Sequence, residues 1–267
     1  MTFVDGVLPI VIGDPQRGVG SVLDAEWLSR AGAVVIPTVI MKRENRQWAD
    51  RVDEGKFRAR FGRFPLEAEL GCAAAHVEAY AALTEEQFDW ALVLEDDAVI
   101  SNQDELRTLV EEITLNCEVR GNVISLYSGG PVFASGTRPL GGLGALELKI
   151  PAHGAVAYLV DRVAAVNLQQ AQSPLASVSD WPSVLDAVDF LYIPNKVITH
   201  AANNVESTIA DGVDRSKMVP FRVRFLMWTG LWFLMHRSQF ISAGAYYVEV
   251  IRPRIATHFW RRAVLDD

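Results

Sequence analysis

Hydrophobic and polar residues follow one another along the chain in a pattern that predicts strands and helices in turn. Apolar runs of strand length lie at residues 7–12 and 33–40, and between them apolar positions at helical spacing predict a helix from Ser21 to about Arg30. Ser21 is a suitable N-cap for this helix and Gly32 a suitable stop. A strand–helix–strand unit of this length favours a parallel sheet, so we expect an α/β fold.

The same alternation continues to about residue 200. Charged residues 41–64 predict a surface helix and a loop, and glycine-rich residues 128–144 predict a mobile loop near the functional site. Further helices are predicted at residues 65–83, 103–117 and 161–171, and further strands at residues 90–94, 122–127, 155–160, 190–193 and 197–200.

One predicted strand ends in three consecutive acids. The apolar run Trp90–Leu94 is followed directly by Glu95, Asp96 and Asp97. Unpaired carboxylates at the end of a buried strand are costly unless a cation lies there, and carboxylate oxygens suit hard ions such as Mg²⁺ or Mn²⁺. Open α/β sheets bind ligands at the carboxyl ends of their strands, where such an ion commonly meets a phosphate. A solvated acidic turn is the alternative, and the three acids alone leave it open.

The helix predicted before this strand carries Glu69, Cys72 and His76 at positions i, i+3 and i+7, which lie on one helix face. A metal site would need more ligands than this face offers. We therefore interpret Cys72 as a small core residue and His76 as a hydrogen-bonded packing residue. A second histidine, His200, ends the last predicted strand.

Composition and charge narrow the class of protein. The chain has 267 residues, of which 50% are hydrophobic, and only two cysteines, which indicates a large globular protein in a reducing compartment. The amino terminus shows no secretory signal, so we expect the cytoplasm. Residues 1–214 hold 16 basic against 30 acidic residues, whereas residues 215–262 hold 9 basic residues against one acid.

This charge shift predicts two parts: a domain at residues 1–214 and a basic, aromatic, helical extension at residues 215–267. The apolar run 225–235 is eleven residues long, and a membrane-spanning helix needs about 20. Basic and aromatic residues surround this run, a pattern typical of membrane-surface contact. We expect residues 216–262 to contact an anionic membrane surface, with core-packing or dimer-forming helices as the alternative. Nucleic acid is not an expected partner.

Several separated motifs resemble those of glycosyltransferase family 25, which includes bacterial lipooligosaccharide galactosyltransferases and collagen galactosyltransferases. Residues 69–76 (ELGCAAAH) are similar to the family signature E-I/L-G-C-x-x-S-H, with Ala75 in place of the serine. Residues 91–97 (ALVLEDD) resemble the family's strand and EDD metal motif. Looser likenesses follow at residues 154–160, 179–181, 194–200 and 207–209.

The resemblance implies a GT-A-like fold, in which helices flank a Rossmann-type, mostly parallel sheet. It implies an inverting hexosyltransferase that moves a hexose from a UDP-sugar to a saccharide acceptor, with galactose as the first candidate for the hexose. That acceptor would be part of lipopolysaccharide, lipooligosaccharide or a related glycan. If the enzyme lies on a membrane, the acceptor would be a lipid-linked saccharide. The implied location is the cytoplasm, peripheral on the inner face of the plasma membrane.

The resemblance also assigns roles to residues. It implies that Glu95, Asp97 and His200 hold Mn²⁺ or Mg²⁺, and that Asp180 is the base that takes the proton of the acceptor hydroxyl. The remaining expected contacts are with the donor or the acceptor, and they involve Glu69, His76, Asp96, Tyr158 and Trp181.

Two other functions compete with this one. A nucleotidyltransferase would also carry acids and Mg²⁺ at a strand end, but it usually has a glycine-rich phosphate loop near the amino terminus, which residues 1–40 do not show. A membrane-associated binding or scaffold protein that kept the fold without catalysis is the other alternative.

Overall fold

The computed structural model describes residues 3–13, 25–61, 64–130, 132–148, 151–152, 154–179 and 188–201. The chain divides into two compact units, Met1–Asp214 and Arg215–Asp267, and all the described residues lie in the first. The helical extension predicted at residues 215–267 lies outside the described residues. The assignment of residues 1–214 as a catalytic domain and of residues 215–267 as a helical extension therefore stays a prediction.

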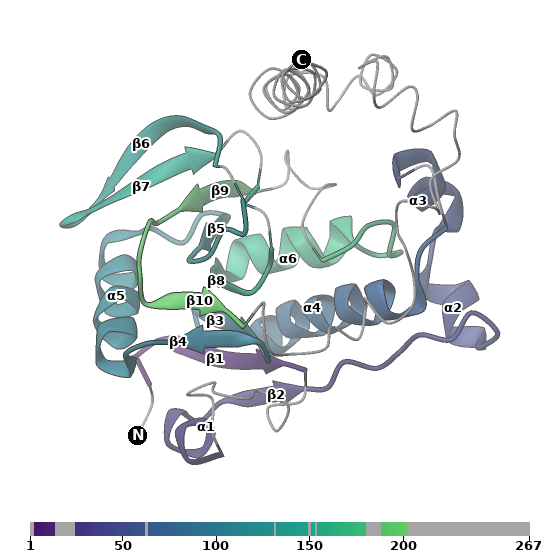
Figure 1. Cartoon of the computed structure of the whole chain (residues 1–267), viewed down its shortest axis with the longest axis horizontal. Helices are drawn as coiled ribbons and strands as arrows, with labels where there is room; N and C mark the ends of the chain where they lie inside the picture. The colour runs from purple at the N-terminus through teal and green to yellow at the C-terminus, as the bar shows by residue number, and fades with distance from the viewer. Residues whose placement is uncertain are drawn as a thin grey trace, which may run out of the picture. The chain divides into compact units, whose positions relative to one another are not determined.

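An eight-stranded mixed sheet forms the centre of the described fold (Figure 1). Its strands are β1 (Val7–Ile12), β2 (Val34–Ile36), β3 (Trp90–Glu95), β5 (Asn122–Ser125), β6 (Ala134–Leu140), β7 (Leu143–Leu148), β8 (Ala157–Asp161) and β9 (Asp189–Tyr192). They lie in the order β2-β1-β3-β8-β5-β9-β7-β6. A separate two-stranded sheet joins β4 (Ala98–Ile100) to β10 (Ile198–His200).

Strand directions confirm the predicted α/β, Rossmann-like architecture. Strand β1 runs parallel to both β2 and β3, as the strand–helix–strand pattern at the start of the chain predicts. Strand β8 lies antiparallel between β3 and β5, and β7 is antiparallel to both β9 and β6, whereas β5 and β9 are parallel. Six of the eight strands consequently point the same way, with β8 and β7 reversed.

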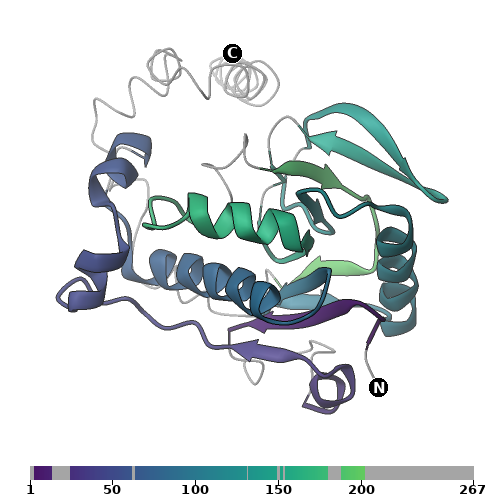
Figure 2. The same cartoon turned by 180° about the vertical axis from the view of Figure 1, so that it is seen from behind.

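Helices cover both faces of the sheet. They are α1 (Ala25–Ala31), α2 (Arg46–Arg51), α3 (Glu54–Phe61), α4 (Glu67–Glu85), α5 (Gln103–Asn116) and α6 (Arg162–Ala171). Alternate residues of β1 pack in opposite directions: Val7 and Val11 join a core with α1 and α5, and Leu8, Ile10 and Ile12 join a core with α4 and α6. Helices α4 and α6 lie side by side (Figures 1 and 2). Because both faces of the sheet are covered at β1 and β3, these two strands are almost continuous apolar runs.

The prediction of a mobile loop at residues 128–144 is wrong over residues 134–144, where the chain forms β6 and the start of β7. These strands make an antiparallel hairpin, and β7 pairs with β9. Polar contacts hold the hairpin: the Gly142 N–H donates to the Glu112 carboxylate (2.7 Å), and the Arg138 guanidinium donates to Asp189 (3.1 Å). Glycine content indicated flexibility, but these long-range contacts fix the backbone.

The strand predicted at residues 33–40 is also shorter in the structure. Strand β2 ends at Ile36, directly before Pro37, which has no N–H to continue the ladder. The chain then passes close to α4, because a Cβ added at Gly71 would come within 2.3 Å of the Val39 carbonyl oxygen. Only glycine allows this close approach of two backbones.

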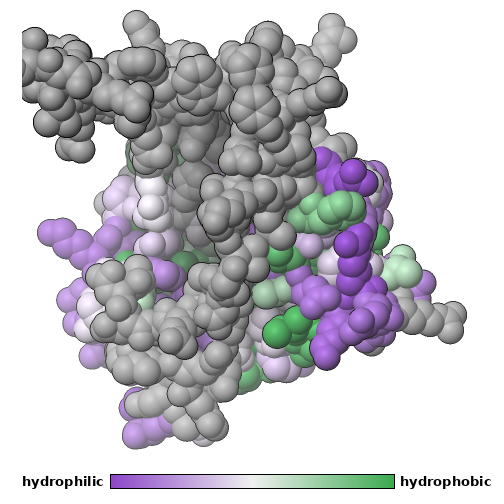
Figure 3. Space-filling view, turned by 45° about the vertical axis from the view of Figure 1, so that its right-hand side comes forward, coloured by the Kyte–Doolittle hydropathy of each residue, from purple (hydrophilic) through white to green (hydrophobic). Residues whose placement is uncertain are grey.

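Exposed apolar residues occur along this same segment. Val39 is 66% exposed and Ile40 is 54% exposed. In the view of Figure 3, hydrophobic (green) areas lie among hydrophilic (purple) ones on the right-hand part of the described surface. None of the helices among the described residues is both long enough and apolar enough to cross a bilayer.

The contact between Gly71 and Val39 leads to a test of stability. We expect Gly71→Ala to lower the free energy of unfolding by about 1–3 kcal/mol, because the added methyl group overpacks against backbone. Gly55→Ala in α3 is the matched control, since its Cβ would meet only the Asp53 side chain, at 3.3 Å. Urea denaturation of both variants measures the difference. Equal effects of the two substitutions would contradict the close approach.

Candidate active site

The carboxyl ends of β1 and β3 meet at the acidic turn. Glu95 lies opposite Ile12 in the parallel pairing of these strands, and the Asp96 N–H donates to the Ile12 carbonyl (2.9 Å). The Glu95 N–H donates to the carbonyl of Val156, just before β8 (2.8 Å). The three acids therefore leave the sheet at its carboxyl edge, the position at which open α/β sheets bind ligands.

The small sheet of β4 and β10 brings His200 to Asp97. Because His200 pairs with Ala98, the residue after Asp97, its ring lies beside that carboxylate. The Ala201 N–H also donates to the Asp97 carbonyl (3.1 Å). His200 Nε2 lies 2.9 Å from Asp97 Oδ2. Two of the three predicted metal ligands are thus neighbours, although 103 positions separate them in the sequence.

Asp97 carries charge that the protein compensates only in part. Its Oδ1 is buried and has no hydrogen-bond partner among the described residues. Burial raises the pKa of Asp97, the negative charge of Glu95 raises it further, and His200 acts in the opposite direction. Burial and the charge of Asp97 also raise the pKa of Tyr127. A cation at Oδ1 would offset these unfavourable terms, so the residues present fit a hard divalent ion.

Glu95 is held from the other side by α4. Its Oε1 lies 3.0 Å from His76 Nε2 and 3.8 Å from Cys72 Sγ. His76 Nδ1 lies 2.8 Å from the Tyr158 hydroxyl, which in turn lies 3.4 Å from the Tyr80 hydroxyl. Burial raises the pKa of both tyrosines, so their hydroxyls stay protonated. A chain of hydrogen bonds therefore runs from the core to Glu95.

His76 and Tyr158, predicted as donor or acceptor contacts, lie behind the acids. Their side chains are buried, and they reach the edge of the sheet through Glu95. Glu69 is also buried, and its carboxylate accepts the Leu66 N–H (3.1 Å), which caps the start of α4. These positions suit residues that orient the acids.

Asp96 lies against the end of β1. A Cβ at Gly13 would come within 2.4 Å of the Asp96 carboxylate, and Gly13 has a φ of +111°, which other residues rarely adopt. Gly13 therefore makes room for Asp96. Asp180 and Trp181 lie outside the described residues, and their predicted roles stay predictions.

The sequence analysis did not identify three residues of this site. Tyr127 lies close to His200, with ring centroids 5.9 Å apart. Tyr127 and Gly13 each follow a strand whose carboxyl end points to the site, so the position of strand ends could have indicated them. Cys72 was interpreted as a core residue, but its sulfur lies at Glu95.

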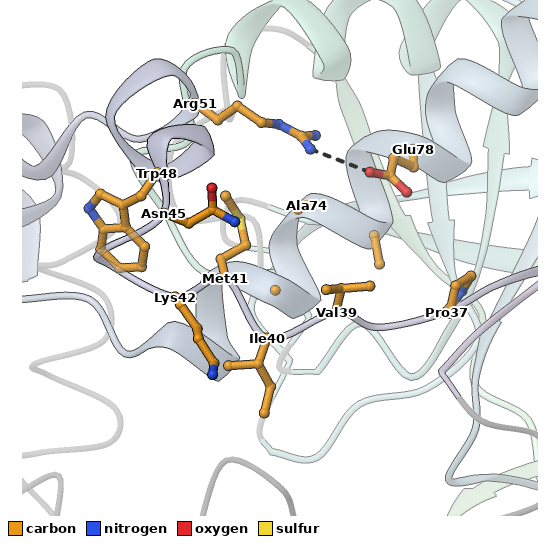
Figure 4. Close-up of a pocket in the computed structure, with 12 residues that line it drawn as sticks. Pro37, Val39, Ile40, Met41, Lys42, Asn45, Trp48, Arg51, Ala74 and Glu78 are labelled. Atoms are coloured by element: carbon orange, nitrogen blue, oxygen red, sulfur yellow. Dashed lines mark ion pairs between the residues drawn. The ribbon is translucent and has the colours of Figure 1, made fainter.

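A separate pocket of about 300 Å³ lies on another face of α4 (Figure 4). Gly71, Ala74, Ala75 and Glu78 line it, together with residues of α2 and of the segment after β2. An ion pair between Arg51 and Glu78 (3.5 Å) crosses one side. The pocket does not include the acids of the β3 turn.

Comparison with known proteins supports the family resemblance. Residues 39–127 match the model of glycosyltransferase family 25, described as an LPS biosynthesis protein, and the suspected family is confirmed over this range. The match includes α4 and the acidic turn but not His200 or Asp180. It supports a glycosyltransferase that acts in lipopolysaccharide biosynthesis, which implies a sugar donor and a saccharide acceptor.

Other comparisons add little. No curated protein has a significant match to the sequence. Among solved structures, the fold is similar to a mannose-1-phosphate geranyltransferase from Thermus thermophilus, with 11% identity and a TM-score of 0.37. That match covers 70% of this chain and 73% of the other.

The raised pKa of Asp97 predicts how stability depends on pH in the metal-free protein. The stabilisation of the folded state by the protonated Asp97 carboxyl is fully present below pH 3.8, the ordinary pKa that this group has in the unfolded chain. It is lost as the pH rises through the raised pKa of Asp97 in the folded state. We therefore expect Asp97→Asn to stabilise the chelator-treated protein at pH 7, and this advantage to shrink as pH falls toward 3.8. Urea denaturation at both pH values measures it.

Asp89→Asn is the control for that comparison, because Asp89 precedes β3 at the opposite end of the same strand. Its effect should not follow the same trend with pH. A loss of stability in Asp97→Asn that is greatest at pH 7 would contradict the account.

Proposed function

We propose that the chain transfers a hexose, with galactose as the first candidate, from a UDP-sugar to a saccharide acceptor with inversion. The reaction would be a step in the synthesis of lipopolysaccharide, lipooligosaccharide or a related glycan. One observation carries this proposal: Oδ1 of Asp97 is buried and has no hydrogen-bond partner among the described residues. Asp97 lies at the carboxyl end of β3, within the range that matches family 25. The GT-A-like fold of the catalytic domain is part of the same proposal.

The proposed cofactor is Mn²⁺ or Mg²⁺, held by Asp97 and His200, which are neighbours, and by Glu95, which would turn from His76 toward the ion. Carboxylate oxygens such as those of Asp97 and Glu95 suit Mn²⁺ and Mg²⁺. When bound, such an ion would supply positive charge to offset the negative charge of the leaving diphosphate. His76 and Tyr158 would keep the Glu95 carboxylate oriented, since the hydrogen bonds from Tyr80 through His76 end at Glu95 Oε1.

The remaining roles concern the two sugars. Asp96 would accept hydrogen bonds from the hydroxyl groups of the ribose or of the transferred sugar. Asp180 would take the proton from the acceptor hydroxyl as it attacks, and the ring of Trp181 would stack on a sugar face. Glu69 supports the site indirectly, because it caps the helix that carries Cys72 and His76.

A lipid-linked acceptor would give the basic, aromatic residues 216–262 a role. Nine basic residues and one acid in residues 215–262 suit attraction to anionic lipid headgroups. We therefore infer a peripheral location on the cytoplasmic face of the plasma membrane.

The function is tested by UDP release from UDP-galactose and other UDP-sugars, with Mn²⁺ or with a chelator. We expect Mn²⁺-dependent release, and we expect Asp97→Asn to lower it at least about a hundredfold, because one charge that holds the metal at the leaving diphosphate is lost. Asp89→Asn should keep the wild-type rate. An Asp97→Asn variant that retains both Mn²⁺ affinity and turnover would overturn the proposal. Silence of the folded wild-type protein with every donor would favour the scaffold alternative.

Membrane contact is tested by sedimentation with vesicles that contain anionic phospholipid. The full chain should sediment with them, and raised salt should weaken the binding because it screens the charges. A chain without residues 216–267 should stay in the supernatant. Equal binding of the full and shortened chains would contradict the role of these residues.

A further inference from the structure

Three side chains of different chemistry meet at the end of β3. Cys72, His76 and Glu95 each offer one ligand atom, and these atoms all lie within 4.8 Å of one another. No other group of three possible metal ligands among the described residues has its ligand atoms this close together. The ligand atoms of Glu95, Asp97 and His200 lie farther apart. The sequence showed Cys72 and His76 on one helix face but could not show the third ligand.

The geometry is close to that of a zinc site. A tetrahedral ion with bonds of about 2.0–2.3 Å spaces its ligand atoms roughly 3.3–3.7 Å apart. Here Oε1 of Glu95 lies 3.0 Å from His76 Nε2 and 3.8 Å from Cys72 Sγ. The ligand atoms of Cys72 and His76 lie within 4.8 Å of each other, so rotations of both the Cys72 and the Glu95 side chains would bring the three atoms to that spacing. Three protein ligands of the S, N and O types leave the fourth position of Zn²⁺ open.

The surroundings of His76 suit a metal ligand. A ligating imidazole usually donates its second N–H to a polar partner, which fixes the ring. His76 Nδ1 lies 2.8 Å from the Tyr158 hydroxyl, and that hydroxyl lies 3.4 Å from the Tyr80 hydroxyl. A hydroxyl both donates and accepts, so Tyr158 can accept the Nδ1 proton and donate its own to Tyr80. With its proton on Nδ1, His76 would present the lone pair of Nε2 to the ion, in place of the hydrogen bond that Nε2 makes to Glu95 without a metal.

Access to the cluster comes from the solvent side. His76 is buried, but Cys72 and Glu95 are only partly buried. An ion can therefore reach the sulfur and the carboxylate first, while His76 closes the site from the core. Neither cysteine of the chain is in a disulfide, so Cys72 keeps its thiol, which a bound metal ion would hold as the thiolate.

We propose that Cys72, His76 and Glu95 form a binding site for a thiophilic divalent cation, Zn²⁺. The site is distinct from the hard-ion site proposed at Asp97 and His200, but the two share Glu95. Occupation by Zn²⁺ draws Glu95 toward α4 and away from the Mn²⁺ of the proposed function. Zn²⁺ therefore acts as an inhibitor of the Mn²⁺-dependent reaction, a consequence that rests on the proposed function, whereas the binding itself does not.

Binding is tested on the full chain with Co²⁺ and Zn²⁺ as probes. Co²⁺ bound to a thiolate gives a charge-transfer absorption in the near ultraviolet, and Zn²⁺ should abolish it by displacement. We expect this band in the wild-type protein and in Cys117→Ser, the matched control at the chain's other cysteine. We expect no band in Cys72→Ser. Tyr158→Phe should bind Zn²⁺ about 10–100-fold more weakly, because the partner of Nδ1 is lost.

A measurement without any substitution keeps the test independent of folding. Zn²⁺ should slow the alkylation of Cys72 by iodoacetamide in the native protein, as mapped by mass spectrometry, and a chelator should restore the rate. Absence of the Co²⁺ band together with unchanged alkylation would overturn the zinc site while leaving Mn²⁺-dependent turnover in place. Conversely, Asp97→Asn should keep the Co²⁺ band even where it removes turnover, so the two proposals fail separately.

Discussion

Two contacts between a histidine and a carboxylate hold the acidic end of β3 in place. His76 meets Glu95 from α4, and His200 meets Asp97 from β10. Between these contacts lie charges that repel one another and that burial disfavours, as the raised pKa of Asp97 shows. The fold tolerates this arrangement because each acid has a partner on one side. The other side of Asp97, at Oδ1, has none among the described residues.

The rest of the described structure serves to bring these partners together. Parallel pairing of β1 with β3 directs the acids to one edge of the sheet, and α4, whose start is capped by Glu69, carries His76 to Glu95. The register of β4 with β10 fixes His200 opposite Ala98. A one-residue shift in that register would turn the imidazole to the opposite face of its strand. Function at this edge therefore depends on pairings between distant parts of the chain.

Sequence patterns predicted the elements of the fold better than their contacts. Strand β1, helix α4 and the acidic turn lie where hydrophobic periodicity and helix-start signals indicated, because those signals are local. Strands β6 and β7 were missed because hydrogen bonds from Arg138 and Gly142 to distant residues outweigh the flexibility that their glycines suggest. The contact of Cys72 with Glu95 joins two elements whose spacing in the sequence carries no distance information.

For the site residues too, sequence patterns predicted individual positions better than the contacts between them. Asp97 could be predicted from three acids at a strand end, and His200 from its place at another strand end together with a family resemblance. Tyr127 could have been found by the same argument from strand ends. The chain of hydrogen bonds from Tyr80 through His76 could not, because no local pattern shows which buried hydroxyl faces a histidine.

The central claim is that a hard divalent ion binds at Oδ1 of Asp97. Anomalous X-ray diffraction from crystals of the wild-type protein grown with Mn²⁺ and UDP tests it most directly. The account predicts a manganese peak within bonding distance of Asp97 and His200, next to the diphosphate. A structure with UDP bound and no manganese at Asp97, or with manganese bound elsewhere, would contradict it.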